Sequence, residues 1–336
     1  MEKIRLGLIG CGGRAKAHMK SWVKMENVTV VAVADPIEER RVAAAQMFGC
    51  SNIYANHTEL YDNCAKDLDA VVICVEPTAH ADIELRAIEL GIPFLVEKPM
   101  TLDLDLADRI AAGVKEKNLI TCVGFQDRYQ DLTDIIMEEM PKHKPGGLVW
   151  GSWVGGIPGV WWWQKKDDCG GQLVEQNIHL LDELRYLFGE PLSVYATASR
   201  GIVKAGEGAS PEYDTDDHST AVFRFPNNVT ATLVSGCYIK PQQNARRPRC
   251  GLYITLEDII FDYRLRNNLI IETPEETRDI PRKADQTETL DIAFIKALQT
   301  GDRSLIRSDY EDALKSLKIC FAANKSMETG EVIYFD

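Results

Sequence analysis

The chain opens with an apolar run that breaks into glycines after the ninth residue, and this feature constrains the fold more than any other. The run at 4–9 predicts a buried strand. The residues that follow match G-x-G-x-x-G/A, a tight turn that leads from a strand directly into a helix. They are Gly10, Gly12, Gly13 and, at the third small position, Ala15, which follows Arg14. Because the first N–H groups of a helix lack partners within the helix, such a turn can bind a pyrophosphate.

A glycine turn alone can also end an ordinary strand, so its context matters. A second apolar run at 28–34 ends at Asp35, twenty-five residues after Gly10. A carboxylate at this place can accept hydrogen bonds from ribose hydroxyls and would repel a 2′-phosphate. The glycine turn and Asp35 together predict a dinucleotide site, with NAD favoured over NADP as the cofactor.

Length, charge and cysteine use narrow the class of protein. A chain of 336 residues predicts two domains, and a net charge of −13 disfavours nucleic acid as a partner. The nine cysteines are scattered without a C-x-x-C pair, which is typical of core residues in a reducing compartment. No apolar run reaches about 18 residues, and no signal peptide precedes the first strand. We therefore expect a cytoplasmic protein without a membrane span.

Strands and helices alternate over the first third of the chain. Further strands are predicted at 70–75, 94–96 and 120–124, and helices at 15–25, 38–48, 79–90 and 104–117. This alternation is typical of a doubly wound parallel sheet with helices on both faces. We take residues 1–124 as the dinucleotide-binding domain.

Longer strands of alternating polarity follow Gly124. They are predicted at 148–154, 192–200, 220–225, 229–235, 252–256 and 259–262, with helices at 173–188, 287–300 and 308–329 and a last strand within 331–336. Turn residues at 226–228 and 257–258 indicate hairpins. This pattern predicts an α+β domain at 125–336 with an antiparallel sheet, one face of which is solvated or used for subunit contact.

Glu97-Lys98-Pro99 follows the short strand at 94–96. Because proline cannot continue a central strand, the strand ends there and presents Lys98 at the edge of the sheet that also carries the glycine turn. A lysine near a bound cofactor can hydrogen-bond a substrate hydroxyl and assist its deprotonation. The alternative is a solvated lysine at the end of a strand.

A second group of candidate residues lies in the segment 170–182. Two glycines precede a predicted helix that places Glu175, His179 and Asp182 on one face. A carboxylate beside an imidazole can orient the ring for proton transfer near neutral pH. The alternative is an ordinary Glu/His pair on a surface. A metal site is disfavoured, because only one histidine and no cysteine occur in the group.

Aromatic and basic side chains offer further candidates for substrate binding. Of the adjacent Trp161, Trp162 and Trp163, at least one is expected to face a cleft, where a ring can stack on a sugar. The alternative is domain packing or a subunit interface. Arg128, near the expected domain boundary, either contacts substrate or pairs with a carboxylate. The basic stretch 240–249, which contains Arg246, Arg247 and Arg249, is expected to be a loop. Its arginines could hold an anionic substrate, but a solvated loop or a subunit contact is the favoured alternative.

Taken in order, these motifs resemble the glucose–fructose oxidoreductase / inositol dehydrogenase / MocA family of NAD(P)-dependent sugar and polyol dehydrogenases. The matching segments are GLIGCGGRAKAH (7–18), VAVAD (31–35), DAVVICVEPTAH (69–80), LVEKPM (95–100), GFQDRY (124–129) and GGQLVEQNIHLLD (170–182). The resemblance implies an N-terminal Rossmann domain and a C-terminal α+β domain with a large, mostly antiparallel open sheet. It also implies a homodimer or homotetramer formed through that sheet.

The resemblance further implies roles for individual residues. Lys98 matches the lysine of the family's E-K-P motif, which contacts the reacting hydroxyl and the nicotinamide. His179 matches the proton-transfer histidine of the D-x-G-x-H-x-x-D motif. Positions on the cofactor side are matched by Glu76, Pro77, His80 and Glu97.

Two residues depart from the family pattern. Glu175 replaces the first aspartate of the D-x-G-x-H-x-x-D motif, and Asn177 replaces its glycine. The longer acid would reach further from the helix. The usual role of that carboxylate, and the substrate of the inositol or glucose enzymes, therefore do not transfer directly to this chain.

These observations predict an NAD-dependent dehydrogenase that oxidises a secondary hydroxyl of a sugar or polyol, with Lys98 and His179 in proton transfer and Glu175 beside them. The expected substrate contacts are Lys98, Arg128, Trp162, Trp163, Glu175 and His179. One alternative is NAD-dependent glycosidase or lyase chemistry without net NADH. The other is a sensor of sugar or dinucleotide without catalysis, although such a sensor need not keep Lys98 and His179.

Overall fold

The computed structural model describes residues 3–240 and 250–335, and its contacts divide the chain into two compact units. The first unit contains Met1–Tyr129 and Ala284–Leu314, and the second contains Gln130–Lys283 and Lys315–Asp336. The expected boundary at 124/125 stays a prediction; in this division 125–129 and 284–314 belong with the N-terminal residues. The expected loop at 240–249 and its three arginines lie outside the described residues, apart from Lys240.

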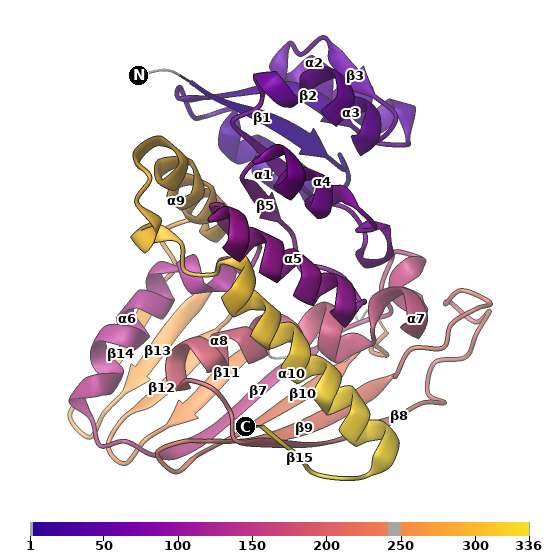
Figure 1. The fold of residues 1–336 in the computed structure, drawn as a ribbon. Helices are drawn as coiled ribbons and strands as arrows, with labels where there is room; N and C mark the ends of the chain where they lie inside the picture. Colours follow the sequence, from indigo (N-terminus) through magenta and orange to yellow (C-terminus); the bar gives the residue numbers. More distant parts are fainter. Residues whose placement is uncertain (1–2, 241–249, 336) are drawn as a thin grey trace. The chain divides into compact units, whose positions relative to one another are not determined.

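The first unit is built on a six-stranded parallel sheet with the order β3-β2-β1-β4-β5-β6 (Figure 1). Its strands are β1 (Ile4–Ile9), β2 (Val28–Ala34), β3 (Asn52–Tyr54), β4 (Ala70–Ile73), β5 (Phe94–Val96) and β6 (Thr121–Val123). Its helices are α1 (Ala15–Trp22), α2 (Glu38–Phe48), α3 (His57–Cys64), α4 (Ile83–Leu90), α5 (Leu104–Lys117) and α9 (Gln286–Thr300). The strand order reverses between β1 and β4, and ligands bind at such switch points in open α/β sheets.

Helix α9 comes from the C-terminal part of the chain yet belongs to the core of the first unit. Its Leu290 and Phe294 are buried in one cluster with Met19 and Trp22 of α1. The sequence predicts this helix but assigns it to the second domain. It brings polar side chains of α9 next to α1, which the site below depends on.

The second unit contains a nine-stranded sheet with the order β14-β13-β12-β11-β7-β10-β9-β8-β15. Its strands are β7 (Gly147–Val154), β8 (Ser193–Ser199), β9 (His218–Phe225), β10 (Val229–Gly236), β11 (Cys250–Thr255), β12 (Ile260–Arg264), β13 (Asn268–Glu272), β14 (Thr277–Pro281) and β15 (Ile333–Tyr334). All neighbours are antiparallel except β7 and β10. The predicted fold class, a doubly wound parallel sheet followed by a mostly antiparallel open sheet, is confirmed.

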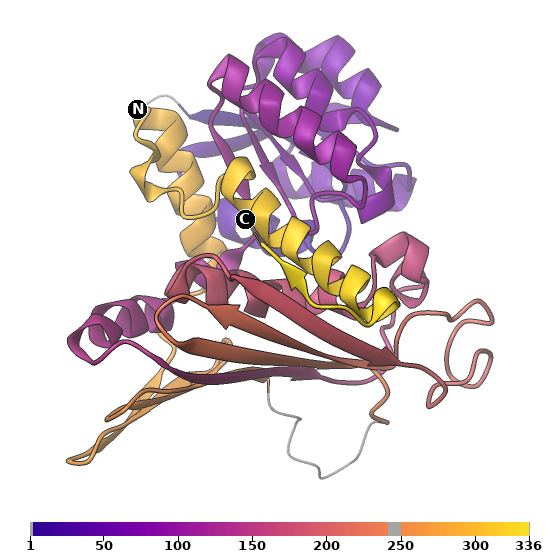
Figure 2. The ribbon, with the colours of Figure 1, turned by 60° about the horizontal axis from the view of Figure 1, so that its bottom comes forward.

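Helices cover one face of this large sheet. They include α8 (Ile178–Phe188) and the part of α10 (Tyr310–Thr329) that follows Lys315 (Figure 2). On β7, buried Val149 and Gly151 alternate with exposed Leu148 and Trp150, so the two faces differ in burial. The remaining helices of this unit are α6 (Asp131–Glu139) and α7 (Lys166–Cys169).

Several elements lie outside the sequence expectations. Among these, α3, α6, β3, β13 and β14 have short or weakly periodic sequences; β14, for example, reads TRDIP and contributes little apolar surface. The predicted helix at 173–188 is divided, because Leu173–Asn177 forms a π-helical turn before α8. No described helix is both long and apolar enough to cross a membrane.

Candidate functional site

The glycine turn joins β1 to α1 at the switch point of the parallel sheet. Gly10 has a φ of +83°, and a Cβ there would lie 2.3 Å from the carbonyl oxygen of Cys74, which follows β4. A Cβ on Gly13 would instead meet no atom within 4 Å. The first turn of α1 contains no acidic side chain. The turn therefore combines a glycine-only bend with accessible backbone at a helix N-terminus, which suits the pyrophosphate of a dinucleotide.

Asp35 ties the end of β2 to this turn. Its Oδ2 accepts a hydrogen bond of 2.7 Å from the N–H of Cys11, and its Oδ1 accepts one of 2.8 Å from the N–H of Ile37. A carboxylate oxygen has two lone pairs, so each oxygen keeps one for a further donor such as a ribose hydroxyl. The predicted cofactor residues of the glycine turn and Asp35 are thus brought together, and the residues present fit a dinucleotide.

Glu97, at the end of β5, is the centre of a buried polar network in the same unit. Its Oε1 accepts hydrogen bonds from Nε of Arg14, at 2.7 Å, and from Nε2 of His18, at 2.9 Å. The Nδ1 of His18 lies 2.7 Å from Oδ1 of Asp291 on α9. Arg14 also donates to the side-chain oxygen of Gln126, at 2.7 Å. One residue of the glycine turn is thereby linked to the E-K-P segment.

The network stabilises the charged forms of His18 and Glu97. Burial lowers the pKa of His18, but the charge of Asp291 and hydrogen bonds to Asp291 and Glu97 outweigh burial and raise it to about 9. Burial raises the pKa of Glu97, but Arg14 and His18 outweigh it and lower that pKa to about 2. At neutral pH the Glu97 carboxylate is therefore held between two cations.

We expect the unfolding free energy to depend on pH through His18. The pKa of about 9 in the folded chain lies above an ordinary value of about 6.5, so the contribution is complete below about pH 6.5 and is lost as pH rises through 9. His18→Gln should remove this pH-dependent part, which is about 3 kcal/mol. Urea unfolding of both proteins between pH 6 and 10 measures it, and parallel curves would contradict the assignment.

Lys98 follows Glu97 and is half-buried. Its backbone N–H donates to Oε2 of Glu97 at 3.3 Å, and the Lys98–Pro99 peptide is cis. The other residues predicted on the cofactor side lie after β4, where Pro77–Ala79 forms a 3-10 turn next to Glu76. His80 is buried there, with its Nδ1 2.5 Å from Oε1 of Glu84. The cofactor roles of Glu76, Pro77, His80 and Lys98 stay predictions.

In the second unit Glu175, in the π-helical turn, and His179, in the first turn of α8, are both buried. Glu175 is 4% exposed and His179 is 5% exposed. The His179 ring stacks on Trp153 of β7, with ring centroids 5.9 Å apart. The guanidinium of Arg266 lies 5.5 Å from the centroid of the same tryptophan. The indole of Trp153 therefore restricts the orientation of the imidazole. The sequence singles out neither Trp153 nor Arg266.

Asp182 takes part in a different set of contacts. Its Oδ1 accepts a 2.7 Å hydrogen bond from Ser316 and lies 3.6 Å from Arg185. Asn177, which replaces the glycine of the family motif, donates to Ser235 at 2.6 Å. The Asp182 carboxylate therefore helps to anchor α8 to α10.

The tryptophan run and Arg128 differ in their surroundings. Trp161 is 60% exposed, whereas the half-buried Trp162 and Trp163 stack with centroids 6.2 Å apart. Arg128 is buried within the first unit, where it pairs with Asp312 at 2.7 Å and donates to the carbonyl of Arg307 at 2.6 Å. Of the two interpretations of Arg128, these contacts favour the carboxylate pair. The substrate contacts of Arg128, Trp162 and Trp163 stay predictions.

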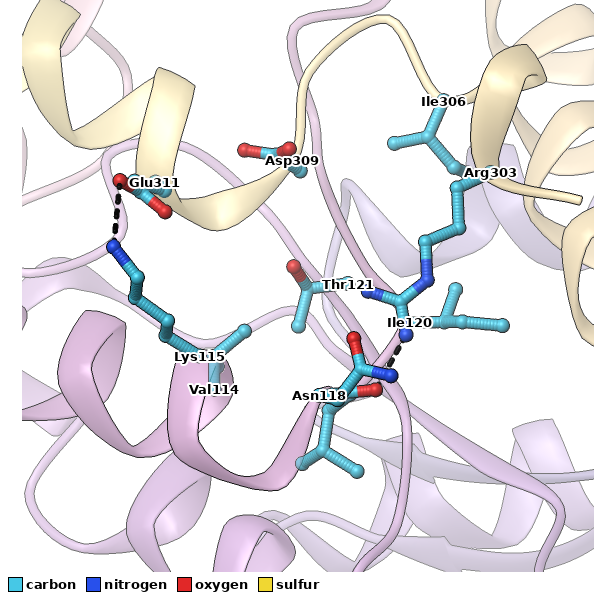
Figure 3. Close-up of a pocket in the computed structure, with 10 residues that line it drawn as sticks. Val114, Lys115, Asn118, Ile120, Thr121, Arg303, Ile306, Asp309 and Glu311 are labelled. Atoms are coloured by element: carbon cyan, nitrogen blue, oxygen red, sulfur yellow. Dashed lines mark hydrogen bonds and ion pairs between the residues drawn. The ribbon is translucent and has the colours of Figure 1, made fainter. Parts of the chain in front are cut away.

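A separate pocket of about 240 Å³ lies between the end of α5 and the segment 303–311 (Figure 3). Lys115 and Glu311 pair across it at 3.9 Å, and Arg303 donates to the carbonyl of Asn118. These contacts join the segment after α9 to α5. The pocket contains none of the residues predicted for the site.

A doubly wound sheet with this turn and acidic residue at its switch point defines a dinucleotide-binding class of protein. Two family models match the chain: the oxidoreductase family with an NAD-binding Rossmann fold, over residues 4–125, and the GFO/IDH/MocA C-terminal domain, over residues 148–257. The chain belongs to the GFO/IDH/MocA family of NAD-binding oxidoreductases. The predicted resemblance, enzyme class and cofactor are confirmed.

The chain is also similar to named relatives, and it shares its fold with a solved structure. The chain is 26% identical to levoglucosan dehydrogenase of Pseudarthrobacter phenanthrenivorans, over 83% of this chain and 78% of the relative. It is 22% identical to myo-inositol 2-dehydrogenase of Thermotoga maritima, over 97% and 96%. A solved levoglucosan dehydrogenase in complex with NADH and levoglucosan shares the fold, with a TM-score of 0.84, 22% identity and 99% of both chains covered.

Proposed function

We propose that the chain is an NAD-dependent dehydrogenase that oxidises a secondary hydroxyl of a sugar or polyol. The observation that carries the proposal is the cofactor cradle at the switch point: the open backbone at Gly13 and the buried Asp35 carboxylate, which accepts the N–H of Cys11 in the same turn. Relatives named as dehydrogenases of levoglucosan and inositol support the substrate class.

In this proposal Lys98 and His179 together assist removal of the proton from the reacting hydroxyl. The bound NAD⁺ would supply the hydride acceptor for the carbon that carries this hydroxyl. His179 accepts the hydroxyl proton, with its ring plane set by Trp153, and Lys98 stabilises the developing negative charge on oxygen. Glu175, on the turn just before His179, orients the imidazole, and Trp162 or Trp163 offers a flat face to the sugar.

A screen of polyols and monosaccharides for NAD⁺ reduction tests the proposal. At least one of them should give a steady rise in the absorbance of the reduced nicotinamide. Glycosidase or lyase chemistry would instead release product while this absorbance stays flat. A sensor would bind NADH and sugar but form no product, and either outcome would replace the dehydrogenase.

Asp35 should set the preference for NAD over NADP. We expect Asp35→Asn to raise the ratio of kcat/KM for NADP⁺ to that for NAD⁺ at least about tenfold, because a charge repulsion near 1.4 kcal/mol or more is removed. Asparagine keeps one acceptor oxygen for the backbone donors of Cys11 or Ile37. Parallel assays with both cofactors measure the ratio. A wild-type chain that prefers NADP⁺ would contradict the assignment.

We also propose that the chain works in the cytoplasm as a homodimer or homotetramer formed through the nine-stranded sheet. All nine cysteines are free thiols, as a reducing compartment requires. The sheet face that carries exposed Leu148, Trp150, Tyr195 and Val222 offers an apolar contact surface. Light scattering on the wild type and on Trp150→Glu tests the assembly, which this variant should weaken.

A further inference from the structure

We propose that His18 is a positioning residue: held between Asp291 and Glu97, it fixes the Glu97 carboxylate beneath the peptide that carries Lys98. The proposal rests on the proposed function, because it assigns the lysine a role in turnover. It goes beyond that function because it makes Asp291 of α9, which follows His18 by 273 residues in the sequence, part of the group that orients the lysine.

The contacts form one continuous chain through the first unit. Asp291 of α9 lies 2.7 Å from Nδ1 of His18, and Nε2 of His18 lies 2.9 Å from Oε1 of Glu97. The other oxygen, Oε2, accepts the backbone N–H of Lys98 at 3.3 Å. The Glu97 side chain therefore folds back on its own strand end, and the hydrogen bond that holds it there also orients the next residue.

Packing limits the freedom of these groups. His18 is fully buried, and its ring stacks on Trp22 with centroids 5.7 Å apart. A Cβ placed on Gly124 would lie 2.5 Å from Oε2 of Glu97, so the carboxylate occupies the space that a side chain at residue 124 would need. Gly124→Ala would therefore displace the Glu97 carboxylate, while His18 and every charged side chain keep their identity.

The charges that face His18 are those of Asp291, Glu97 and Arg14. The buried thiols of Cys74 and Cys122 lie near the same carboxylates, and burial raises the pKa of both above the ordinary thiol value. These thiols stay neutral in the assay range. Deprotonation of His18, with a pKa of about 9, leaves one N–H for two carboxylates and so releases one of the contacts.

The experiment compares His18→Gln, Gly124→Ala and Asp291→Asn with the wild type. We expect His18→Gln and Gly124→Ala to lower kcat by about 10- to 100-fold, as for a misplaced reacting group. The NADH dissociation constant, measured by fluorescence, should stay within about threefold, because the glycine turn and Asp35 are unchanged. Glu288→Gln, which removes one acidic charge from α9 at an exposed pair with Lys24, is the matched control and should retain the wild-type kcat.

The pH profile separates positioning from a general loss of structure. The kcat of the wild type should fall as pH rises through about 9, and Asp291→Asn should move this fall at least one pH unit lower, since the neutral amide no longer favours the imidazolium. Imidazole NMR signals of the apo protein, assigned by their absence in His18→Gln, should shift over the same range. A fall due to Lys98 itself would not move in Asp291→Asn.

The outcomes of these experiments distinguish a failure of the positioning role from a failure of the proposed function. Unchanged kcat in His18→Gln and Gly124→Ala, with wild-type turnover intact, would overturn the positioning role and leave the proposed function standing. A loss of NADH affinity as large as the loss of kcat in both variants would also overturn it, since it would show a structural role only. A wild-type chain that binds NADH but reduces no NAD⁺ with any sugar or polyol would remove the proposed function first, and the positioning role with it.

Discussion

Replacing Lys98 by methionine should lower turnover by at least about 10²-fold and by as much as about 10⁴-fold, the usual contribution of a positioned acid–base group. Methionine keeps most of the side-chain length and volume but removes the ammonium group. The backbone N–H of residue 98 remains to hydrogen-bond Glu97, so the end of β5 should keep its conformation. The loss should therefore appear in kcat, while the NADH dissociation constant stays near the wild-type value.

His179→Ala should have an effect of the same size through the other half of the proposed proton transfer. The substitution removes a buried ring that stacks on Trp153, so some loss of stability is expected beside the loss of turnover. His179→Gln, which keeps more of the volume, separates the two effects. Turnover should fall in both variants even when the unfolding midpoint of the glutamine variant is close to that of the wild type.

Two surface variants serve as controls for the loss of a lysine or a histidine outside the site. Lys117→Met removes an exposed lysine at the end of α5, and His143→Ala removes a histidine that pairs with Asp258. Neither residue belongs to a candidate site, so both should turn over substrate like the wild type. If Lys98→Met or His179→Ala kept full kcat beside these controls, the catalytic assignment of that residue would be wrong.

Local sequence signals are enough to predict a strand or helix whose ends are determined by the residues next to them. The strand at 94–96 and the helix at 104–117 occur at the predicted residues. The helix begins there because the Asp103 side chain accepts N–H bonds from residues 105 and 106, and it ends at Asn118 in the left-handed region. Boundaries of this kind depend only on residues adjacent in the sequence, so they can be predicted from a single sequence.

The network around Glu97 could not be predicted in the same way. His18 and Glu97 both occur in segments that the sequence singles out, but Asp291, the second carboxylate that His18 contacts, lies on a helix assigned to the other domain. Nothing in the local pattern of α9 marks Asp291, because burial of a carboxylate is favourable only once the imidazolium is beside it. Tertiary packing of α9 on α1 supplies that condition.

The helix with His179 shows a different limit. The predicted common face of Glu175, His179 and Asp182 assumes 3.6 residues per turn, whereas the structure inserts a π-helical turn at Leu173–Asn177. The extra residue in that turn changes the direction of Glu175 relative to α8. π-Turns often occur at functional sites, and here the turn includes both residues that depart from the family motif.

Gly10→Ala should destabilise the protein more than any other single change in the glycine turn. The new Cβ would lie 2.3 Å from the carbonyl oxygen of Cys74, and the backbone φ of +83° is unfavourable for any residue with a Cβ. Left-handed strain costs about 1–3 kcal/mol, and overpacking against a fixed backbone costs about 1–3 kcal/mol more. We therefore expect the unfolding free energy in urea to fall by about 2–6 kcal/mol.

Gly13→Ala is the informative counterpart, because the same methyl group there meets no protein atom within 4 Å. Its unfolding free energy should equal or exceed that of the wild type, since alanine reduces the freedom of the unfolded chain. If the open backbone at Gly13 faces the pyrophosphate, the methyl group should still weaken NADH binding by about tenfold or more, a change of about 1.4 kcal/mol. Stability loss in Gly10→Ala and affinity loss in Gly13→Ala would assign the two glycines different roles, one in the bend and one at the ligand. Wild-type NADH affinity in Gly13→Ala would contradict the cradle, because a ligand held by that backbone cannot be indifferent to an added side chain.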